Sequence, residues 1–372
     1  MGYRSGVCAW SGDAGGFTDW ILEGCVVDAG RIRFDPGGHP AVATSPWVTP
    51  SFAPSSAIVS WNCDTPGATA VELGVQLRRG DGSDSLWFSM GRWSATPGVP
   101  RGSVEAQNER AISVRTDTLV SAEPFRSMRV RAIAHCAATF GGGPGPALRR
   151  VTLAWSDPIP ASWVGPPAVT GTRPGEAVGR VVIDGVPECS QMVYPDGGNV
   201  WCSPVSLAMV IGYWRGETVC APLVEEMRAG VYDPVYGGHG NWAFNVAWAG
   251  ALGFVAEVVR FPSLAAARPW IAAGVPLILS ISWGAEKGRP LTGAPVASSN
   301  GHLTVLVGID DEGRAIVNEP AARDVASVRR TYAPDEFERC WLTASGGVAY
   351  VVYPPGQRVP ELHGGYAVST AS

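Results

Sequence analysis

The hydrophobic pattern of this chain changes once, at a segment rich in proline and glycine. Before residue 158, apolar residues alternate or form short runs between Gly, Pro, Asp and Ser, which is the pattern of strands and turns. After residue 180, apolar stretches with helical spacing come first and strands follow. Residues 158–180 follow neither period, which is typical of a linker. The sequence therefore predicts two domains, and 372 residues allow each to bury its own core.

The first domain, residues 1–160, is expected to be an antiparallel β-sandwich of jelly-roll type. Its short runs of β-branched and aromatic residues are regularly spaced, and no long helical period interrupts them. The predicted strands are residues 57–61, 70–77, 85–90, 112–120, 128–135 and 151–155. Trp61, Trp87 and Trp93 lie in this half and could stack on sugar rings if exposed, or fill the space between the sheets if buried.

The second domain, residues 181–356, is expected to be α+β, because helices come first and a hairpin-rich sheet follows. The predicted helices are residues 202–214, 242–252 and 264–273, and the predicted strands are 275–283, 302–309 and 315–318. We assign residues 161–180 to the linker and 357–372 to a tail.

Charge and hydropathy exclude several classes of partner. Charged residues make up 16% of the chain, below the roughly 25% typical of soluble domains, and the formal net charge is −5 without any run of Lys or Arg. This distribution gives no footprint for nucleic acid or anionic lipid. The longest uncharged apolar stretches, 246–256 and 275–283, are shorter than the ~18 residues of a membrane helix, so no transmembrane segment is expected. The first 16 residues contain no apolar signal-peptide segment, so localisation stays open between the cytoplasm and export after trimming.

The eight cysteines do not predict a metal site. None forms a C-x-x-C pair or has a histidine at zinc-site spacing, and we expect neither a metal nor another cofactor. Most lie in apolar contexts, where a free cysteine behaves as a small core residue. In an exported protein some could pair, but the sequence does not say which.

Cys202 begins the predicted helix 202–214. Pro204 follows closely, and a proline near the first helical position is a start signal because an N–H there would have no partner in the helix. The residues after Pro204 are apolar except Ser206 and Gly212, so the helix is predicted to be buried on all sides. The sulfur then lies at the positive end of a buried helix dipole, which favours a thiolate nucleophile. The alternative is a small core residue at a helix start.

His302 begins an apolar strand, residues 302–309, which is followed by a tight turn and a returning strand that ends in Asn318 and Glu319. Such a hairpin brings its two far ends together, so the imidazole is expected to lie beside an amide or a carboxylate. A group of this kind holds the tautomer of a general base. Adjacent strand residues face opposite ways, so only one of Asn318 and Glu319 should point at His302.

Four segments between residues 185 and 354 carry a resemblance to a known family. They are SQMVYPDGGNVWCSPVSLAMVIGYW, GNWAFNVAWAGALGF, AAGVPLILSISW and NGHLTVLVGIDDEGRAIVNEPA, in this order. Together they resemble the C39-like cysteine peptidases, a papain-fold group that includes bacteriocin-leader-processing domains and stand-alone bacterial proteins. The resemblance implies a stand-alone bacterial protein with a papain-like catalytic domain after an N-terminal β-rich domain.

The same resemblance implies roles for the site residues. Cys202 would be the nucleophile, His302 the base, and Gln191 would place its side-chain amide in the oxyanion hole beside the backbone N–H of Cys202. The family usually ends this hairpin in Asp-Pro, whereas this sequence has glutamate at that position. We expect Glu319 to orient His302, with Asn318 as the alternative because papain-like enzymes can use asparagine in this role.

Three further residues are expected near the substrate. His239 lies in a glycine-flanked loop before a predicted helix, where it could position the substrate backbone, although a surface-loop residue has the same pattern. Trp201 and Trp242, at the starts of the two apolar helices, are expected as substrate contacts.

These expectations define one main function and two alternatives. The main prediction is a cysteine peptidase that cleaves an amide bond of a peptide or protein through a thioester intermediate. The first alternative is a protein with little or no turnover whose Trp-rich first domain binds a glycan or a cell-wall polymer. The second is an acyltransferase that uses the same thiolate and an amine acceptor.

Overall fold

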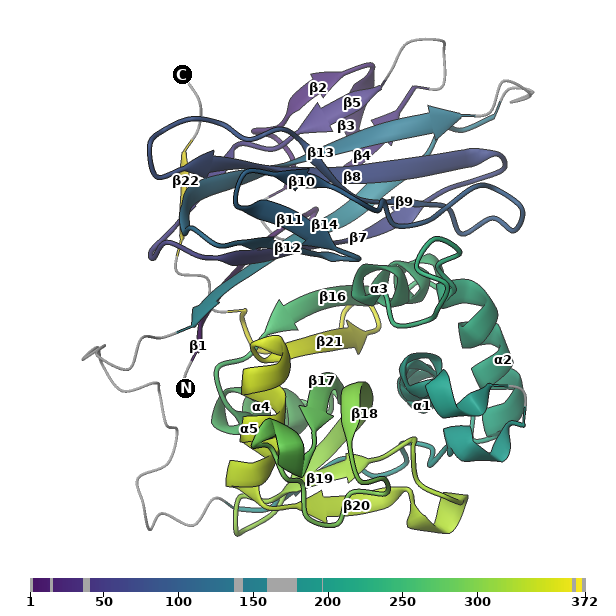
Figure 1. Cartoon of the computed structure of the whole chain (residues 1–372). Helices are drawn as coiled ribbons and strands as arrows, with labels where there is room; N and C mark the ends of the chain where they lie inside the picture. Colours follow the sequence, from purple (N-terminus) through teal and green to yellow (C-terminus); the bar gives the residue numbers. More distant parts are fainter. Residues whose placement is uncertain are drawn as a thin grey trace.

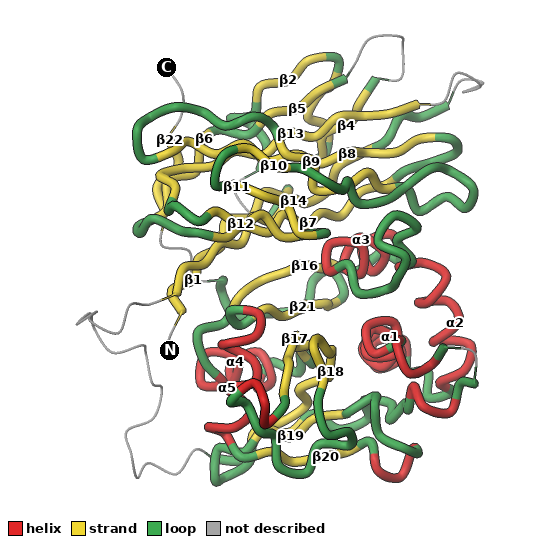
Figure 2. Tube along the Cα trace, viewed as in Figure 1, coloured by secondary structure: helices red, strands yellow, loops and turns green. Residues whose placement is uncertain are grey.

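The structure is a computed structural model that describes residues 3–13, 16–35, 41–136, 143–158, 179–195, 197–362 and 366–369. The chain forms a β-rich domain that lies against an α+β domain (Figure 1). Every helix of the described residues belongs to the second domain (Figure 2). This confirms the predicted order of a β-rich domain followed by a mixed one. Most of the expected linker, residues 161–180, lies outside the described residues.

The first domain consists of two antiparallel sheets. One has the strand order β10-β11-β12-β7-β14-β4-β3, with β1 also paired to β14. Its strands are β1 (Tyr3–Ser11), β3 (Cys25–Asp28), β4 (Arg31–Phe34), β7 (Ser56–Asp64), β10 (Asn108–Glu109), β11 (Ile112–Arg115), β12 (Thr118–Ser121) and β14 (Ala147–Pro158). The other has the order β2-β5-β13-β6-β22, with β8 paired to β13 and β9. Its strands are β2 (Ile21–Glu23), β5 (Val42–Thr44), β6 (Trp47–Pro50), β8 (Thr69–Arg79), β9 (Phe88–Trp93), β13 (Phe125–Cys136) and β22 (Tyr366–Ser369).

One hydrophobic core lies between these two sheets. Alternate apolar residues of both contribute to it, together with the fully buried rings of Trp61 and Trp93. Trp87 is half-buried, and the guanidinium groups of Arg129 and Arg131 lie over its ring. Trp61 and Trp93 therefore fill the core of the domain, and Trp87 stacks with arginine side chains.

Two strand predictions of the first domain need correction. The stretch 112–120 was predicted as one strand but forms the hairpin β11–β12. Its turn has Thr116 at φ 56°, a left-handed conformation that is rare for a β-branched residue and that the pattern of apolar residues does not reveal. The strand predicted at 85–90 begins later, because β9 spans Phe88–Trp93.

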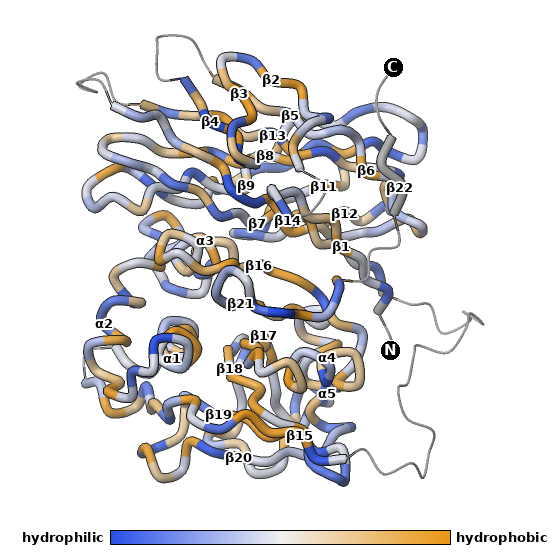
Figure 3. Tube along the Cα trace, turned by 180° about the vertical axis from the view of Figure 1, so that it is seen from behind, coloured by the Kyte–Doolittle hydropathy of each residue, from blue (hydrophilic) through white to orange (hydrophobic). Residues whose placement is uncertain are grey.

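The second domain has one antiparallel sheet with the order β16-β21-β17-β18-β19-β20, and β15 pairs with β18. Its strands are β15 (Val181–Val182), β16 (Val255–Arg260), β17 (Leu277–Trp283), β18 (Ser299–Ile309), β19 (Ala315–Asn318), β20 (Arg329–Tyr332) and β21 (Val348–Tyr353). The helices are α1 (Cys202–Arg215), α2 (Cys220–Val231), α3 (Trp242–Ala251), α4 (Leu264–Ala272) and α5 (Pro334–Ser345), with short 3₁₀ turns at Gln191–Val193, Gly198–Val200, Ala285–Lys287 and Val325–Ser327. Helix α1 packs against the sheet, and both carry mainly hydrophobic residues at their contact (Figure 3).

Helix α3 joins the two domains. Phe244 is fully buried in the core of the first domain, where its ring makes edge contacts with Trp61 and Trp93 at centroid distances of 6.2 and 5.0 Å. Beside it, the Asn62 side chain donates to the carbonyl of Ala256 at 2.8 Å and accepts from its N–H at 3.1 Å. The domain interface is thus packed as a protein interior.

Two further contacts cross between the domains. The buried carboxylate of Glu257 pairs with Arg150 at 3.1 Å and accepts from the Thr152 hydroxyl at 2.8 Å. Strand β22, near the C-terminus, pairs antiparallel with β6 of the first domain. Part of the segment that we expected to be a tail therefore belongs to a sheet of that domain.

Among the described residues, no helix combines the length and the apolar character that crossing a membrane requires.

Candidate active site

Cys202 is the first residue of helix α1. The helix is buried along most of its length, as its apolar sequence predicts, whereas the Cys202 side chain is half-buried and lines a cleft. Because a helix does not use the N–H groups of its first turn, the backbone N–H of Cys202 is available to an external acceptor. The sulfur and this N–H thus lie together at the edge of an open space.

His302 lies on β18 and is connected to both proposed partners. Its Nε2 is 2.5 Å from Glu319 Oε1, and the imidazole is also hydrogen bonded to the Cys202 side chain. Because Nε2 faces the carboxylate, Nδ1 is the ring nitrogen left for the thiol. The Ser206 hydroxyl on α1 donates to the Leu303 carbonyl at 3.1 Å, which fixes the helix beside the histidine strand.

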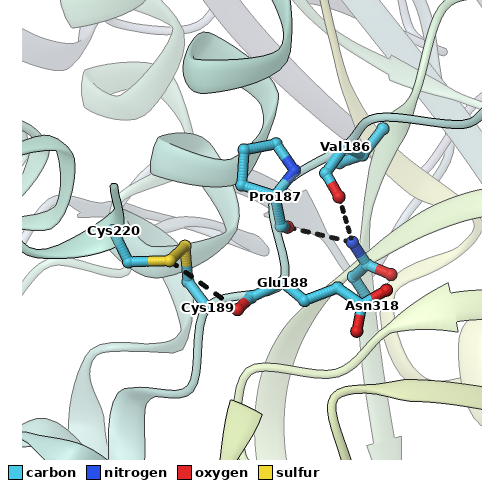
Figure 4. Close-up of a disulfide and its surroundings, with 6 residues drawn as sticks. All are labelled: Val186, Pro187, Glu188, Cys189, Cys220 and Asn318. Carbon is cyan, nitrogen blue, oxygen red and sulfur yellow. Dashed lines mark hydrogen bonds between the residues drawn. A yellow bond between two sulfur atoms is a disulfide. The ribbon is translucent and has the colours of Figure 1, made fainter. Parts of the chain in front are cut away.

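Glu319 contacts His302, and Asn318 does not. The Asn318 side chain instead donates to the carbonyls of Val186 and Pro187 (Figure 4). Glu319 Oε1 accepts from the N–H of Ala321 at 2.9 Å as well as facing the imidazole. The longer side chain therefore folds back onto its own backbone, which accommodates a glutamate where the resembling family has aspartate.

The electrostatics of this pair favour a charged imidazole. Burial by itself lowers the pKa of His302, but the Glu319 carboxylate and the hydrogen bond with Cys202 oppose it and raise the pKa to about 10. His302 is 4% exposed and Glu319 is fully buried, so bulk water weakens their attraction little. An imidazolium between a sulfur and a carboxylate is the arrangement that a thiolate nucleophile requires.

Trp283 packs against the histidine, a position that its sequence context does not reveal. Its ring meets the His302 ring edge-on at 5.2 Å with an interplanar angle of 89°, and the residue is 1% exposed although it lines the cleft. It ends β17, and Ile281 on that strand pairs with His302. The only signal in the sequence was an aromatic residue at the end of a predicted strand, which is common in cores.

Gln191 lies next to this set because its segment is fastened to the hairpin end. Its backbone N–H donates to the Pro320 carbonyl at 2.7 Å, and the Ser190 hydroxyl donates to the Ala322 carbonyl at 2.5 Å. Gln191 lines the cleft, and within the described residues its side chain makes no hydrogen bond. Its amide is thus free to donate to a ligand in the cleft.

The segment from Cys189 to Cys202 is held at two points. A disulfide joins Cys189 to Cys220 at the start of α2 (Figure 4). A Cβ at Gly198 would lie 2.1 Å from the carbonyl oxygen of Gln191, so this position has room only for glycine. Cys189 and Cys220 are therefore disulfide-bonded, whereas most of the cysteines were expected to be free core residues.

The three expected substrate contacts differ in position. His239 and Trp242 line the cleft, but Trp201 is not among the described residues that do so. Trp201 is 8% exposed, and its ring packs against Tyr194 and His239 with the Arg228 guanidinium above it. We therefore replace the expected substrate contact of Trp201 with a packing role. Burial and the Arg228 charge lower the pKa of His239 to about 4, so its imidazole is neutral near pH 7.

The cleft has a volume of about 1190 Å³, and both domains form its walls. From the second domain come Cys202, His302 and the loop 236–240, and from the first come Ser55, Ser56 and the β11–β12 hairpin. In the described part of the chain, no group of His, Cys, Asp and Glu side chains is arranged to hold a metal ion. The side chains gathered at the site carry a thiol, an imidazole, a carboxylate and an amide.

The fold and site define a class of two-domain proteins in which an α+β domain presents a Cys–His–carboxylate set at an interdomain cleft. A comparison with known protein families gives a more specific assignment of each domain. Residues 183–349 match the Peptidase_C39 like family, and residues 30–156 match the Peptidase C39 N-terminal domain. The second domain is thus a member of the C39-like peptidase family, as its sequence resemblance predicts, and the first is the N-terminal domain that accompanies such peptidases.

Two solved structures are also similar to parts of the chain. A Bacillus anthracis protein, provisionally assigned as a C39-like peptidase, matches 49% of this chain and 99% of its own length at 18% identity and a TM-score of 0.35. Carbohydrate-binding modules of the β-sandwich superfamily match 43% of this chain at 9% identity and a TM-score of 0.20, and the match spans only 57% of their length. A comparison with curated proteins found no match.

Proposed function

We propose that this protein is a papain-like cysteine peptidase in which Cys202 is the nucleophile, His302 the acid and base, and Glu319 the group that orients the imidazole. The observation that carries the proposal is the position of His302, which lines the cleft together with Cys202 and has the buried Glu319 Oε1 as its other partner. The fold proposed with it is a jelly-roll-type sandwich followed by a papain-like domain with the thiol on a helix and the imidazole on the facing sheet.

The first half of the reaction forms a thioester. The Cys202 thiolate attacks the carbonyl carbon of the substrate amide, and negative charge develops on the carbonyl oxygen. The His302 imidazolium then donates its proton to the amide nitrogen, the C–N bond breaks, and the amine leaves. The second half reverses these roles: His302 takes a proton from water, the resulting hydroxide attacks the thioester, and the C–S bond breaks to release the acid.

Two donors are placed to stabilise the negative oxygen. One is the backbone N–H of Cys202 at the start of α1, and the other is the side-chain amide of Gln191, which lines the cleft without a partner among the described residues. Removal of one such donor typically lowers kcat about 10²- to 10³-fold. We expect this loss for Gln191→Ala, with a smaller change in KM.

The proposal is tested by the reactivity of the cysteines. We expect iodoacetamide to label Cys202 faster than the half-buried free thiol of Cys136, and digestion of a denatured protein mixture to yield peptides that are absent with Cys202→Ala. Loss of the nucleophile should lower kcat by at least about 10⁴-fold.

Cys136→Ala is the matched control, because Cys136 is a free cysteine of similar exposure on the other domain. Equal labelling of Cys202 and Cys136, or cleavage that persists in Cys202→Ala, would show that the cleft is not a peptidase site.

The glycan-binding alternative finds less support in the first domain. A sugar-binding tryptophan must present an open ring face, whereas Trp61 and Trp93 are buried and arginine side chains lie over Trp87. We propose that the tryptophans of this domain serve its core and its contact with α3.

A further inference from the structure

We propose that the turn of the β11–β12 hairpin forms a substrate subsite in the cleft, where the guanidinium of Arg115 selects an acidic side chain of the peptide. This inference rests on the proposed peptidase function and names a substrate class for it. It also assigns the first domain a direct part in substrate recognition.

The hairpin turn is part of the cleft wall. Arg115, Thr116, Asp117 and Thr118 line the same cavity as Cys202 and His302. A peptide that lies across the thiol therefore meets side chains from both domains. A subsite formed by one domain against a nucleophile on the other is a common position for specificity, since ligand clefts often lie between domains.

A residue of the second domain holds this turn in position. The Asp117 carboxylate accepts from the backbone N–H of Trp242, at the start of α3, and from the Thr118 hydroxyl. A second contact between the domains lies nearby in the sequence, where Asp233 of the second domain accepts from the N–H of Ser103 and from the N–H groups of Val235 and Tyr236. The subsite is thus attached to the second domain by a charged hydrogen bond between the Trp242 N–H and the Asp117 carboxylate.

The charges that line the cleft favour an anionic ligand. The Asp117 carboxylate is 6% exposed and is used by Trp242 and Thr118, so it offers little negative charge to the cleft. Arg260 also lines the cleft, and it donates to the Ser345 carbonyl and to the Ser56 hydroxyl.

Arg115 differs from these groups because it is exposed, and the described residues give its side chain neither an ion pair nor a hydrogen bond. His239 lines the cleft as a neutral ring, and His302 faces Glu319. The charge that remains open to a ligand is therefore positive. A planar guanidinium binds a carboxylate through two parallel hydrogen bonds, which gives direction as well as attraction. Among peptide side chains, aspartate and glutamate fit this group.

The experiment uses the full chain and a set of peptidyl vinyl sulfones that differ only in Glu, Gln or Lys at one of four successive positions. We expect Glu at one position to increase the rate of Cys202 alkylation over Lys by about 3- to 5-fold, the size of one partly exposed ion pair. Arg115→Glu should abolish or invert this preference, and high salt should reduce it. The rate with iodoacetamide should stay unchanged.

Arg126→Glu is the matched control, because Arg126 is an exposed arginine of the same domain that does not line the cleft. The inference is overturned if no position prefers Glu, or if Arg115→Glu and Arg126→Glu behave alike. If Cys202 reacts with none of the probes, the result contradicts the proposed peptidase function and leaves the subsite to a separate test. Binding of fluorescent Glu and Lys peptides to Cys202→Ala, measured by fluorescence anisotropy, then decides whether the subsite prefers an acidic ligand.

Discussion

Glu319 shows how a single residue sets the charge of the site. Its Oε1 faces His302 and accepts from the N–H of Ala321, so the carboxylate cannot turn away from the imidazole without losing a second hydrogen bond. The raised pKa of His302 depends on this negative charge, because burial acts in the opposite direction. A substitution of Glu319 by glutamine keeps the shape of the side chain and removes its charge, so this variant isolates the effect of the charge.

We predict that Glu319→Gln moves the alkaline limb of the kcat/KM profile to lower pH. Without the carboxylate, burial dominates and the pKa of His302 falls from about 10, so the imidazolium that protonates the leaving amine is lost earlier. The measurement is peptide hydrolysis across pH 5 to 10, with Gln191→Ala as a control that should keep the wild-type limb. An unshifted limb in Glu319→Gln would mean that His302 does not titrate under the influence of Glu319.

The same titration affects the stability of the fold. The pKa of His302 is raised from 6.5 to about 10 in the folded state, so the stabilisation is fully present below pH 6.5 and is lost as pH rises through about 10. Urea unfolding at pH 6 and pH 10 should therefore show a smaller loss of unfolding free energy in Glu319→Gln than in the wild type. An equal loss in both proteins would contradict this origin of the pH dependence.

At the scale of elements, the loop from Cys189 to Cys202 positions two of the proposed catalytic groups. The disulfide to Cys220 holds one end of this loop against α2, and the backbone bond from Gln191 to Pro320 holds it against the hairpin. Close contact of Gly198 with the Gln191 carbonyl fixes its middle. The proposed oxyanion donor is thus positioned by covalent, hydrogen-bonding and steric constraints together.

We predict that the double variant Cys189→Ala/Cys220→Ala unfolds more easily by about 3 to 4 kcal/mol, the chain-entropy value for a loop of this length. The sequence separation of the two cysteines is 31 residues. Guanidinium unfolding measures the change, and Cys136→Ala, which removes a free thiol, should stay within about 0.5 kcal/mol of the wild type. A double variant as stable as the wild type would show that the disulfide does not constrain the chain.

We also predict that Gly198→Ala lowers kcat toward the value of Gln191→Ala. A methyl group at this position would lie 2.1 Å from the Gln191 carbonyl oxygen, so the backbone that carries the proposed oxyanion donor has to move. Gly80→Ala is the control, since a Cβ there meets nothing within 4 Å. Unchanged kcat in Gly198→Ala would mean that the position of Gln191 is not critical.

At the scale of the whole molecule, the two domains share one packed interface. Phe244 of the second domain is part of the core of the first, and the buried Glu257 pairs with Arg150 across the interface. Inter-domain contacts of this kind make relative domain motion costly. The cleft between the domains should therefore have a fixed width.

We predict that Phe244→Ala destabilises both domains together by about 3 to 5 kcal/mol, because it leaves a cavity beside Trp61 and Trp93. Tryptophan fluorescence, to which residues of both domains contribute, should change in a single urea transition, and loss of Cys202 reactivity should follow the same transition. Leu86→Ala, at a residue that is 67% exposed, should have little effect. Two separate transitions in the wild type would contradict a shared interface.

Several predictions from the sequence are confirmed and others needed the structure. The β-rich first domain, the α+β second domain and the family of the second domain follow from local periodicity and from motifs in order. The helices α2 and α5 were not predicted, and the hairpin β11–β12 was taken as one strand. These failures differ in cause. The start of α5 carries local signals that the prediction did not use, namely Pro334 at its first position and acidic residues in its first turn. The left-handed turn at Thr116, in contrast, leaves no mark in the apolar pattern.

The sequence by itself determined which residues could react. A proline near the helix start places Cys202 at the first turn of a helix, and the hairpin brings His302 at the start of one strand near Asn318 and Glu319 at the end of the next. It also required that only one of those two neighbours face the imidazole. Tertiary structure alone decided that this neighbour is Glu319, that Cys189 pairs with Cys220, and that Arg115 of the first domain lines the cleft. The physical reason is the distance along the chain over which each kind of information acts. Periodicity tells which way a side chain points within its own helix or strand. The contacts named above join segments that are far apart in the sequence, so they depend on how whole sheets and domains pack.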